Sequence, residues 1–366
     1  MFLTVHGGFS QSLSPDRVAL AIEALTQLGK ERVAGDPKLS ALLQRALDAT
    51  RGTPRFVDLV RRMEVSGQSE GLIETAVKAS DLSVGAEALR MVLDQNGQDL
   101  LRSHLKSTNS VALIRLVQAL GNTGDQNAHQ LMEPIALDSH ADLQVRRQVV
   151  RSMAQTRAGS SALLALARSD RLPTDLKLVA RGELHAARWP EIKAEAEQLL
   201  PSPKSSGSEP LPPVRELIER TGNPERGALV FEKPEVGCIR CHQVNGRGID
   251  FGPKLSEIGT KLGKDALYEA ILEPSAGISF DFEAWEVLLN NGDETLGLIV
   301  SETADEITVK TQNGVLTRYP KDGIESRRKM NTSIMPSGLE QTMSVTDLVD
   351  LVEYLTSLKT ATPTQP

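Results

Sequence analysis

The sequence predicts a mainly α protein, in which an N-terminal α-solenoid is followed by a second helical domain with an inserted small antiparallel β-sheet. Aromatic residues make up only 3% of the chain although hydrophobic residues make up 40%. This balance suits stacked helices filled with Leu, Ala and Val better than a single mixed core. Short amphipathic segments run from Asp16 to about Leu200, and one later stretch is rich in β-branched residues. A length of 366 residues exceeds one usual core, so we expect two or three domains.

The repeated segments have a period typical of helical solenoids. Four apolar positions recur at an offset of 33 residues, and a degraded third copy covers residues 178–187. The segment "DLQVRRQVVRSMA" is similar to the second helix of a HEAT-type repeat. We therefore predict a HEAT-like helical repeat domain over residues 1–200, which would offer an extended surface to a protein partner. The matching positions are Leu116, Val117, Leu120 and Gly121 against Val149, Val150, Met153 and Ala154.

A domain boundary is predicted in "PSPKSSGSEPLPP", residues 201–213. Five prolines and no apolar periodicity indicate a semi-extended linker. The second domain is then expected over residues 214–359, with a C-terminal tail over 360–366.

Two capped helices enclose this second domain. Asn223 suits the N-cap and Pro224 the first turn of one helix. Ser344 and Asp347 have the spacing of a capping box at the start of the last helix. Both helices are therefore predicted to begin at these residues.

Between the two helices lies a segment of strand character. Residues 283–319 alternate in polarity and contain Asn291-Gly292 and Asn313-Gly314, which are strong hairpin signals. We expect a small antiparallel sheet inserted over about residues 280–326.

The chemistry of the chain is concentrated in "CIRCH", which holds both of its cysteines, Cys238 and Cys241, followed by His242. A structural zinc site would need four ligands, and neither a second cysteine pair nor a later histidine is present. A thioredoxin-like redox pair would need a βαβ context, which the surrounding sequence does not offer. The remaining interpretation is one covalent haem c, bound through both thiols, with the histidine on the iron. No catalytic residue is predicted.

The sixth iron ligand is predicted to be Met335. Three methionines follow the motif, and Met335 stands in the Pro/Gly/Ser-rich loop "NTSIMPSGL", where an apolar side chain needs something to face. Met330 and Met343 are the alternatives. The backbone carbonyl of Pro253 is expected to accept a hydrogen bond from His242 Nδ1, which would leave Nε2 free for iron.

Apolar residues after the motif are expected to line the haem pocket and exclude water from it. Ordinary core packing explains each of them equally well. They are Phe251, Leu255, Ile258, Leu267 and Ile271.

Residues 214–359 resemble a class I cytochrome c domain in these motifs. More closely, "GALVFEKPEVGCIRCHQVNGRGIDFGPKLSEIG", "ILEPSAGI" and "SIMPSGL" are similar to the planctomycete/verrucomicrobial-type haem-binding domain. That domain is commonly the C-terminal domain of exported proteins in which HEAT-like repeats follow a glucose/sorbosone-dehydrogenase-like propeller. The resemblance implies a cytochrome c-like helical domain and an associated dehydrogenase as electron donor.

The same resemblance implies a periplasmic or otherwise extracytoplasmic location, because haem of this type is attached outside the cytoplasm. The first residues, "MFLTVHGGFSQSLSPDRV", lack the basic and apolar regions of a signal peptide. We therefore expect the chain to be the C-terminal portion of a longer protein or the product of a mis-started gene.

Three functions remain open at this stage. The first is one-electron transfer by a mono-haem module with His242 and Met335 on the iron, within or beside a dehydrogenase rather than as a catalyst by itself. The second is a scaffold or sensor whose haem domain serves docking. The third is an open iron site that acts on a small ligand or peroxide, if Met335 is not bound.

Charge and hydropathy exclude two classes of partner. The formal net charge of -7 argues against binding to nucleic acid. The sequence contains no run of 18 apolar residues, so no transmembrane segment is predicted. Basic residues near the motif would form either a positive rim for an acidic redox partner or ordinary solvated surface. They are Arg240, Arg247, Lys254, Lys261, Lys264 and the segment 325–329.

Overall fold

The computed structural model describes residues 15–201, 210–233 and 236–359. Most of the predicted linker, residues 202–209, and the predicted tail, 360–366, lie outside these ranges. By the density of internal contacts the chain forms two compact units. Unit 1 is Met1–Thr123 with Asp142–Gln148, and unit 2 is Gly124–Ala141 with Val149–Pro366. The predicted domain boundaries were drawn from the composition of the sequence, whereas these units are defined by internal contacts. The boundaries therefore stay a prediction.

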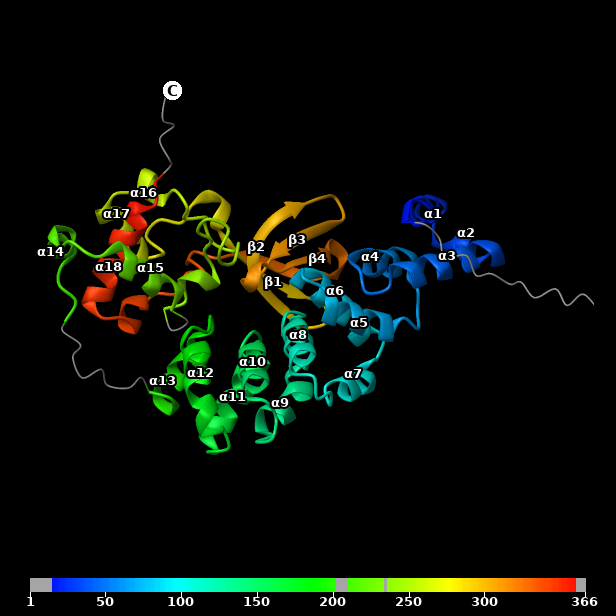
Figure 1. Cartoon of the computed structure of the whole chain (residues 1–366), viewed down its shortest axis with the longest axis horizontal. Helices are drawn as coiled ribbons and strands as arrows, with labels where there is room; N and C mark the ends of the chain where they lie inside the picture. Colours follow the sequence, from blue (N-terminus) through cyan, green and yellow to red (C-terminus); the bar gives the residue numbers. More distant parts are fainter. Residues whose placement is uncertain (1–14, 202–209, 234–235, 360–366) are drawn as a thin grey trace, which may run out of the picture. The chain divides into compact units, whose positions relative to one another are not determined.

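The fold class is confirmed, since the described residues are mainly helical and contain one small antiparallel sheet (Figure 1). None of the described helices combines the length and apolar character needed to cross a bilayer. The helices of unit 1 are α1 (Pro15–Leu28), α2 (Lys30–Ala34), α3 (Pro37–Thr50), α4 (Pro54–Met63), α5 (Ser69–Lys78), α6 (Leu82–Asp94), α7 (Gln98–His104) and α8 (Ser110–Gly121).

The remaining helices belong wholly or largely to unit 2. They are α9 (His129–Leu137), α10 (Leu143–Met153, which crosses the division between the units), α11 (Arg157–Arg168), α12 (Thr174–His185), α13 (Pro190–Leu199), α14 (Val214–Glu219), α15 (Pro224–Glu232), α16 (Ile258–Lys261), α17 (Lys264–Leu272) and α18 (Val345–Ser357).

The repeated apolar positions are the buried faces of their helices. Leu116, Val117 and Leu120 on α8 are almost completely buried within unit 1, where α5, α6 and α8 pack on one another. Val149, Val150 and Met153 on α10 are equally buried. Each helix thus covers an apolar face that it could not bury alone. Membership of the HEAT repeat family stays a prediction.

Both predicted helix starts are confirmed. The Asn223 side chain accepts a hydrogen bond from the backbone N–H of Arg226 at 2.7 Å, and Pro224 opens α15. Ser344 and Asp347 form a complete capping box at the start of α18. These caps satisfy backbone donors that the first helical turn cannot.

Helices α15 and α18 pack closely because α15 carries a glycine at the contact. A Cβ built on Gly227 would lie 2.0 Å from the carbonyl oxygen of Asp350 and 2.7 Å from Cβ of Tyr354. The rings of Phe231 and Tyr354 meet beside this point at 5.9 Å. Only a residue without a side chain fits such an approach.

A buried carboxylate ties the same two helices together. Asp350, 3% exposed, accepts hydrogen bonds from the backbone N–H of Asn223 at 2.7 Å and from Nε of Arg226 at 2.7 Å. The Arg226 side chain holds the pKa of Asp350 below its usual value. The carboxylate is therefore charged and paired in the folded protein.

We expect Asp350→Asn to lower the free energy of unfolding by about 2 kcal/mol at neutral pH, since a buried charge-assisted hydrogen bond is lost. Because the folded pKa lies below the unfolded value of about 3.9, this stabilisation is complete above that pH and is lost as pH falls through the folded pKa. Urea unfolding at several pH values would measure it. An unchanged acid dependence in the variant would contradict the assignment, and Arg226→Gln should weaken the acid dependence in the same direction but less, since Arg226 is largely exposed and Asp350 keeps its bond to Asn223.

The inserted sheet has five antiparallel strands in the order β4-β3-β2-β1-β5. The Asn-Gly hairpins are confirmed, with Gly292 joining β1 to β2 and Asn313-Gly314 joining β3 to β4, all at positive φ. Figure 1 shows β1 to β4 side by side. The strands are β1 (Ala284–Leu289), β2 (Glu294–Glu302), β3 (Glu306–Lys310), β4 (Leu316–Pro320) and β5 (Ile324–Lys329).

The last strand returns to the first, so the insert leaves the helical domain and rejoins it at nearly the same point. Trp285 on β1 is paired with Lys329 on β5, and the backbone N–H of Met330 donates to the carbonyl of Ala284 at 2.8 Å. The strands of the sheet form a small buried apolar cluster of their own, which consists of Val287, Ile307 and Val309.

Within unit 2 the sheet also contacts helices that precede the predicted linker. The Trp189 indole N–H donates to Glu294 at 2.8 Å, and the guanidinium of Arg188 lies 4.5 Å from the Trp189 ring centre. Arg157 and Arg188 approach the same carboxylate at 3.5 Å and 3.7 Å. The segment after α12 and the β1–β2 hairpin are therefore joined by a charged, partly buried contact.

Candidate functional site

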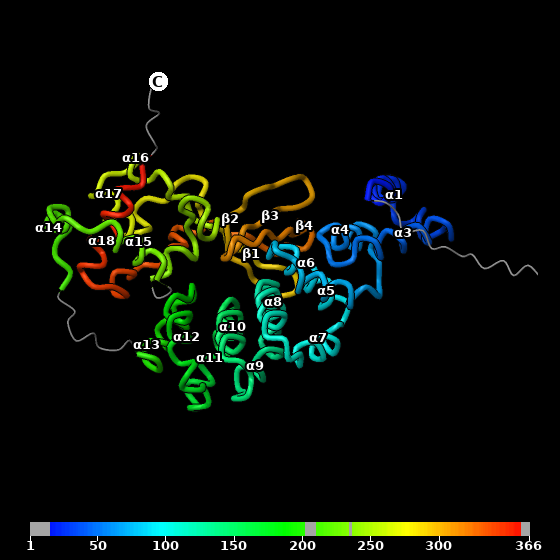
Figure 2. The backbone as a smooth tube through the Cα atoms, in the orientation of Figure 1, coloured from blue at the N-terminus to red at the C-terminus, as the bar shows by residue number. Residues whose placement is uncertain are grey.

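The two cysteines and the histidine lie on one tight turn. Gly237 at φ 79° begins the 3-10 helix Cys238–Arg240. The backbone N–H groups of Cys241 and His242 both donate to the carbonyl of Cys238, at 3.1 Å and 2.9 Å. This turn brings together the two thiols, which are free and half-buried. Figure 2 follows the backbone of this segment between α15 and α16.

His242 has the hydrogen bond that the sequence predicts. Its Nδ1 lies 2.8 Å from the carbonyl oxygen of Pro253. A carbonyl can only accept, so Nδ1 carries the proton and the lone pair is on Nε2. Burial lowers the pKa of His242, against the opposing effect of the Pro253 carbonyl. The imidazole is therefore neutral, in the tautomer that a metal ligand needs.

The loop that follows is wrapped tightly around the motif. The backbone N–H groups of Phe251 and Gly252 donate to the carbonyl of Cys241 at 3.1 Å and 2.7 Å. A Cβ on Gly252 would lie 2.8 Å from the His242 ring, and one on Gly248, at φ 103°, would lie 2.2 Å from the His242 carbonyl. Two glycines are thus required for the loop to pass over the histidine, and neither requirement was predicted from the sequence.

Several predicted site residues meet at one apolar cluster. Cys238, Leu255 and Met335 are half-buried and pack against it. Met343 packs there too, whereas Met330 follows the end of β5. Phe251 is buried but lies outside this cluster. The core of the cluster is Leu217, Val230, Phe231, Val236, Val244, Leu267, Tyr268, Ile271, Leu348, Val349, Leu351, Val352 and Leu355.

The donor set fits a haem better than a free metal ion. Burial raises the pKa of Cys238 to about 12 and also raises the pKa of Cys241, so both groups are neutral thiols at neutral pH. Two thiols and the adjacent histidine give at most three ligands, one fewer than a closed structural zinc site needs, whereas CxxCH is the set of residues that attaches a haem c. Within the described ranges, no three His, Cys, Asp or Glu side chains are grouped closely enough to hold a metal ion.

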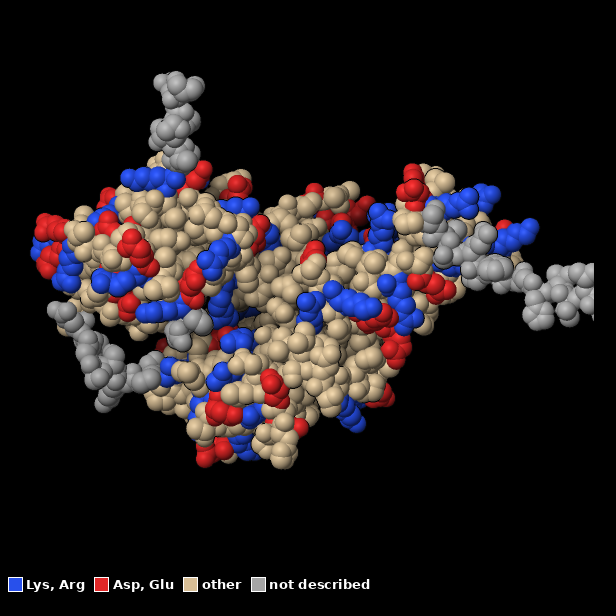
Figure 3. Space-filling view, in the orientation of Figure 1, with Lys and Arg blue, Asp and Glu red and all other residues tan. Residues whose placement is uncertain are grey.

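Most basic residues near the motif are paired with carboxylates. Ion pairs join Arg247 to Glu232 at 2.9 Å and Lys264 to Glu353 at 2.7 Å. Three more on β5 pair with carboxylates, namely Arg327, Arg328 and Lys329. Lys and Arg alternate with Asp and Glu over the face seen in Figure 3. These contacts favour solvated surface charge over a positive rim.

One ion pair of the motif was not predicted. Arg240, between the two cysteines, donates from Nη2 to Glu183 on α12 at 2.7 Å. The two residues are 57 positions apart, so no local pattern in the sequence could have indicated the contact.

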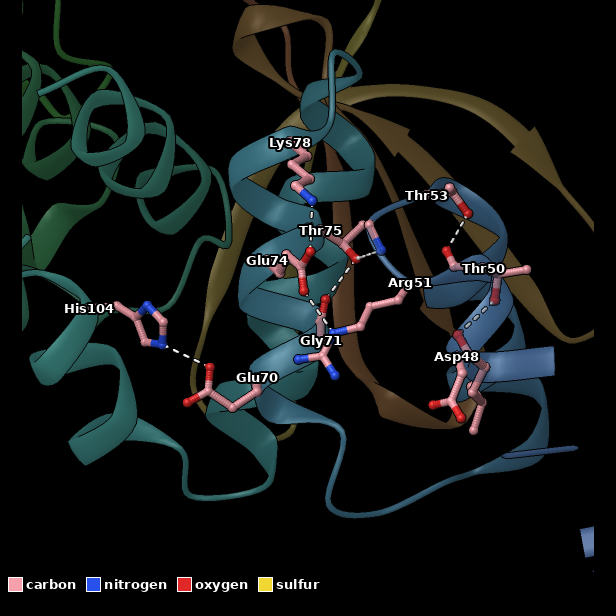
Figure 4. A network of polar contacts seen from close by, with 12 residues as sticks. Asp48, Thr50, Arg51, Thr53, Glu70, Gly71, Glu74, Thr75, Lys78 and His104 are labelled. Atoms are coloured by element: carbon pink, nitrogen blue, oxygen red, sulfur yellow. Dashed lines mark hydrogen bonds and ion pairs between the residues drawn. The ribbon is translucent and has the colours of Figure 1, made fainter. Parts of the chain in front are cut away.

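Unit 1 holds a separate groove of about 310 Å³. On its rim Glu74 binds both Arg51 and Lys78 at 2.7 Å, and His104 Nε2 lies 3.0 Å from Glu70 (Figure 4). Because these side chains already bind one another, they indicate no class of ligand for the groove.

Comparison with known protein families matches part of the chain. The family model "Cytochrome c" matches residues 224–284. These residues include Cys238, Cys241, His242, Phe251, Pro253 and Leu255, and they end at the first residue of β1, before Met335. No curated protein matches the chain. The matched segment implies a covalently bound haem c and a redox partner, in a domain type that is typically extracytoplasmic.

Proposed function

We propose that this chain, which contains a cytochrome c segment at 224–284, is a mono-haem module for one-electron transfer. The observation that supports the proposal is the hydrogen bond from His242 Nδ1 to the Pro253 carbonyl, which leaves the Nε2 lone pair free for iron on the turn that also carries both thiols. The bound haem would supply a single iron that alternates between the ferric and ferrous states.

In this proposal, Cys238 and Cys241 hold the haem through two thioethers, and His242 and Met335 are its axial ligands. Pro253 fixes the imidazole in one tautomer and orientation. Leu255 keeps water from the iron, as do Ile258, Leu267 and Ile271 at the same cluster. A fixed, dry coordination shell reorganises little when an electron moves, and a thioether ligand favours the ferrous state.

The wider context of the proposal comes from the resemblance. A periplasmic or other extracytoplasmic location suits the attachment of haem c. The electron donor would be a dehydrogenase, in the same polypeptide or beside it, and the HEAT-like repeats would offer a surface to a protein partner.

The proposal is tested at the sixth ligand. The chain would be expressed with an added export signal and c-type maturation machinery, and ferric and ferrous spectra recorded. We expect low-spin covalent haem in the wild type and loss of the long-wavelength ferric iron–sulfur band in Met335→Ala, which should become high-spin or misligated. Met343→Ala is the matched control, because Met343 packs at the same cluster and should leave the band unchanged.

The alternative functions predict different spectra. High-spin covalent haem in the wild type would favour an open site that acts on a small ligand or peroxide. Loss of the band in Met343→Ala instead of Met335→Ala would reassign the ligand. A wild type that acquires no haem would leave the scaffold or sensor function.

A further inference from the structure

Arg240, one of the two residues between the cysteines, is held by a helix from the predicted repeat domain. Arg240 Nη2 lies 2.7 Å from Oε2 of Glu183, and the Glu183 side chain is only 11% exposed. Arg240 itself is one-third exposed. Both residues belong to unit 2. A charge pair this close and this shielded is worth more than a surface pair.

Glu183 is in an unusual place for a carboxylate. It lies two residues before the end of α12, Thr174–His185, where the carbonyl ends of the helix make a negative charge unfavourable. Two cations offset this cost, Arg240 at 2.7 Å and Arg151 at 3.9 Å. The local preference of the helix therefore does not explain Glu183, but its partner in the motif does.

The pair also controls the charge next to the thiols. Arg240 Nη2 donates to Glu183 Oε2 at 2.7 Å, so the guanidinium faces a carboxylate that is largely shielded from solvent. Arg240 is thus a cation whose charge is balanced by Glu183. Without Glu183, a partly buried positive charge would remain between Cys238 and Cys241.

We propose that Glu183 is a positioning residue for the haem-attachment turn, and that by anchoring and neutralising Arg240 it sets the reduction potential of the bound haem. This inference rests on the proposed function. Ferric haem carries one more positive charge than ferrous haem, so an unbalanced cation nearby favours the ferrous state and an unbalanced anion favours the ferric state.

A charge cycle in the full-length haem-loaded chain tests the inference by redox titration. Glu183→Gln should raise the reduction potential and Arg240→Gln should lower it, each by about threefold to tenfold in the reduction equilibrium, where tenfold equals about 59 mV for one electron. The double variant should return close to the wild type, because it removes one positive and one negative charge and leaves the net charge of the cluster unchanged. Glu183→Asp keeps the charge and should stay close to the wild type.

The matched control is Glu232→Gln, which releases Arg247 near the same turn. Arg247 is 73% exposed, so solvent screens its charge and the potential should move by less than half as much. Circular dichroism would show which variants fold. If Glu183→Gln does not fold, the inference is still tested by two results. Arg240→Gln should lower the reduction potential, and the double variant should restore it.

The outcomes separate this inference from the proposed function. If the wild type binds covalent haem, but both single variants shift the potential in the same direction or by no more than Glu232→Gln, only the role of Glu183 is overturned. If the wild type acquires no haem, both the proposed function and the role of Glu183 are overturned. Shifts of opposite sign that cancel in the double variant would support the inference, since damage to the fold would not reverse sign.

Discussion

Replacing Cys238 and Cys241 together by alanine should leave the chain without any covalently bound haem. The chain has no other cysteine, so no other thiol can form a thioether. Both thiols lie on one turn and are half-buried, and Cys238 packs against the apolar cluster, which is where a haem edge would be held. The measurement is the haem that remains with the protein after extraction with acidified acetone, followed by haem staining of a denaturing gel.

The single variants Cys238→Ala and Cys241→Ala serve as controls for this result. Each keeps one thiol, so each should retain reduced amounts of haem through a single thioether, with a pyridine haemochrome band at a longer wavelength than the wild type. Complete extraction of haem from the wild type itself would contradict covalent attachment.

Gly227→Val should prevent the second domain from folding into its haem-binding form. A Cβ at this position would lie 2.0 Å from the Asp350 carbonyl, and backbone on the adjacent helix cannot move aside as a flexible side chain can. Separating α15 from α18 would also break the hydrogen bonds to Asp350 and the contact of Phe231 with Tyr354. We expect a loss of about 3 kcal/mol or more.

Urea unfolding and the yield of covalent haem would measure the effect of Gly227→Val. Gly277→Ala is the matched control, because nothing lies within 4 Å of a Cβ built on Gly277. That variant should differ from the wild type by less than about 0.5 kcal/mol. Equal stability of the two variants would mean that α15 and α18 do not pack as described.

Local sequence patterns predicted the parts of this structure that depend on near neighbours. Asn223 and Ser344 cap their helices because caps act within one turn, and Asn313-Gly314 forms a hairpin because both residues accept positive φ. The acceptor role of Pro253 was also predictable, since a turn only eleven residues after His242 can place a carbonyl against its ring.

Contacts between distant segments could not be predicted in the same way. Glu183 and Arg240 carry no pattern that pairs them, and Trp189 and Glu294 are separated by 105 residues. The need for Gly248 depends on a close approach that only the folded loop creates. The sixth ligand stays a prediction, because Met335 and Met343 share the same apolar surroundings.

The return of β5 to β1 gives the insert the topology of a side excursion. The chain enters the sheet at Ala284 and leaves it at Met330, and a hydrogen bond of 2.8 Å joins these two residues. The path of the flanking helical segments therefore does not depend on the length of the inserted sheet. Such a point tolerates the gain, loss or exchange of a whole sheet during evolution, because neither flanking segment has to be re-routed. The cytochrome c match ends at this same residue, Ala284, so the matched segment stops where the sheet begins.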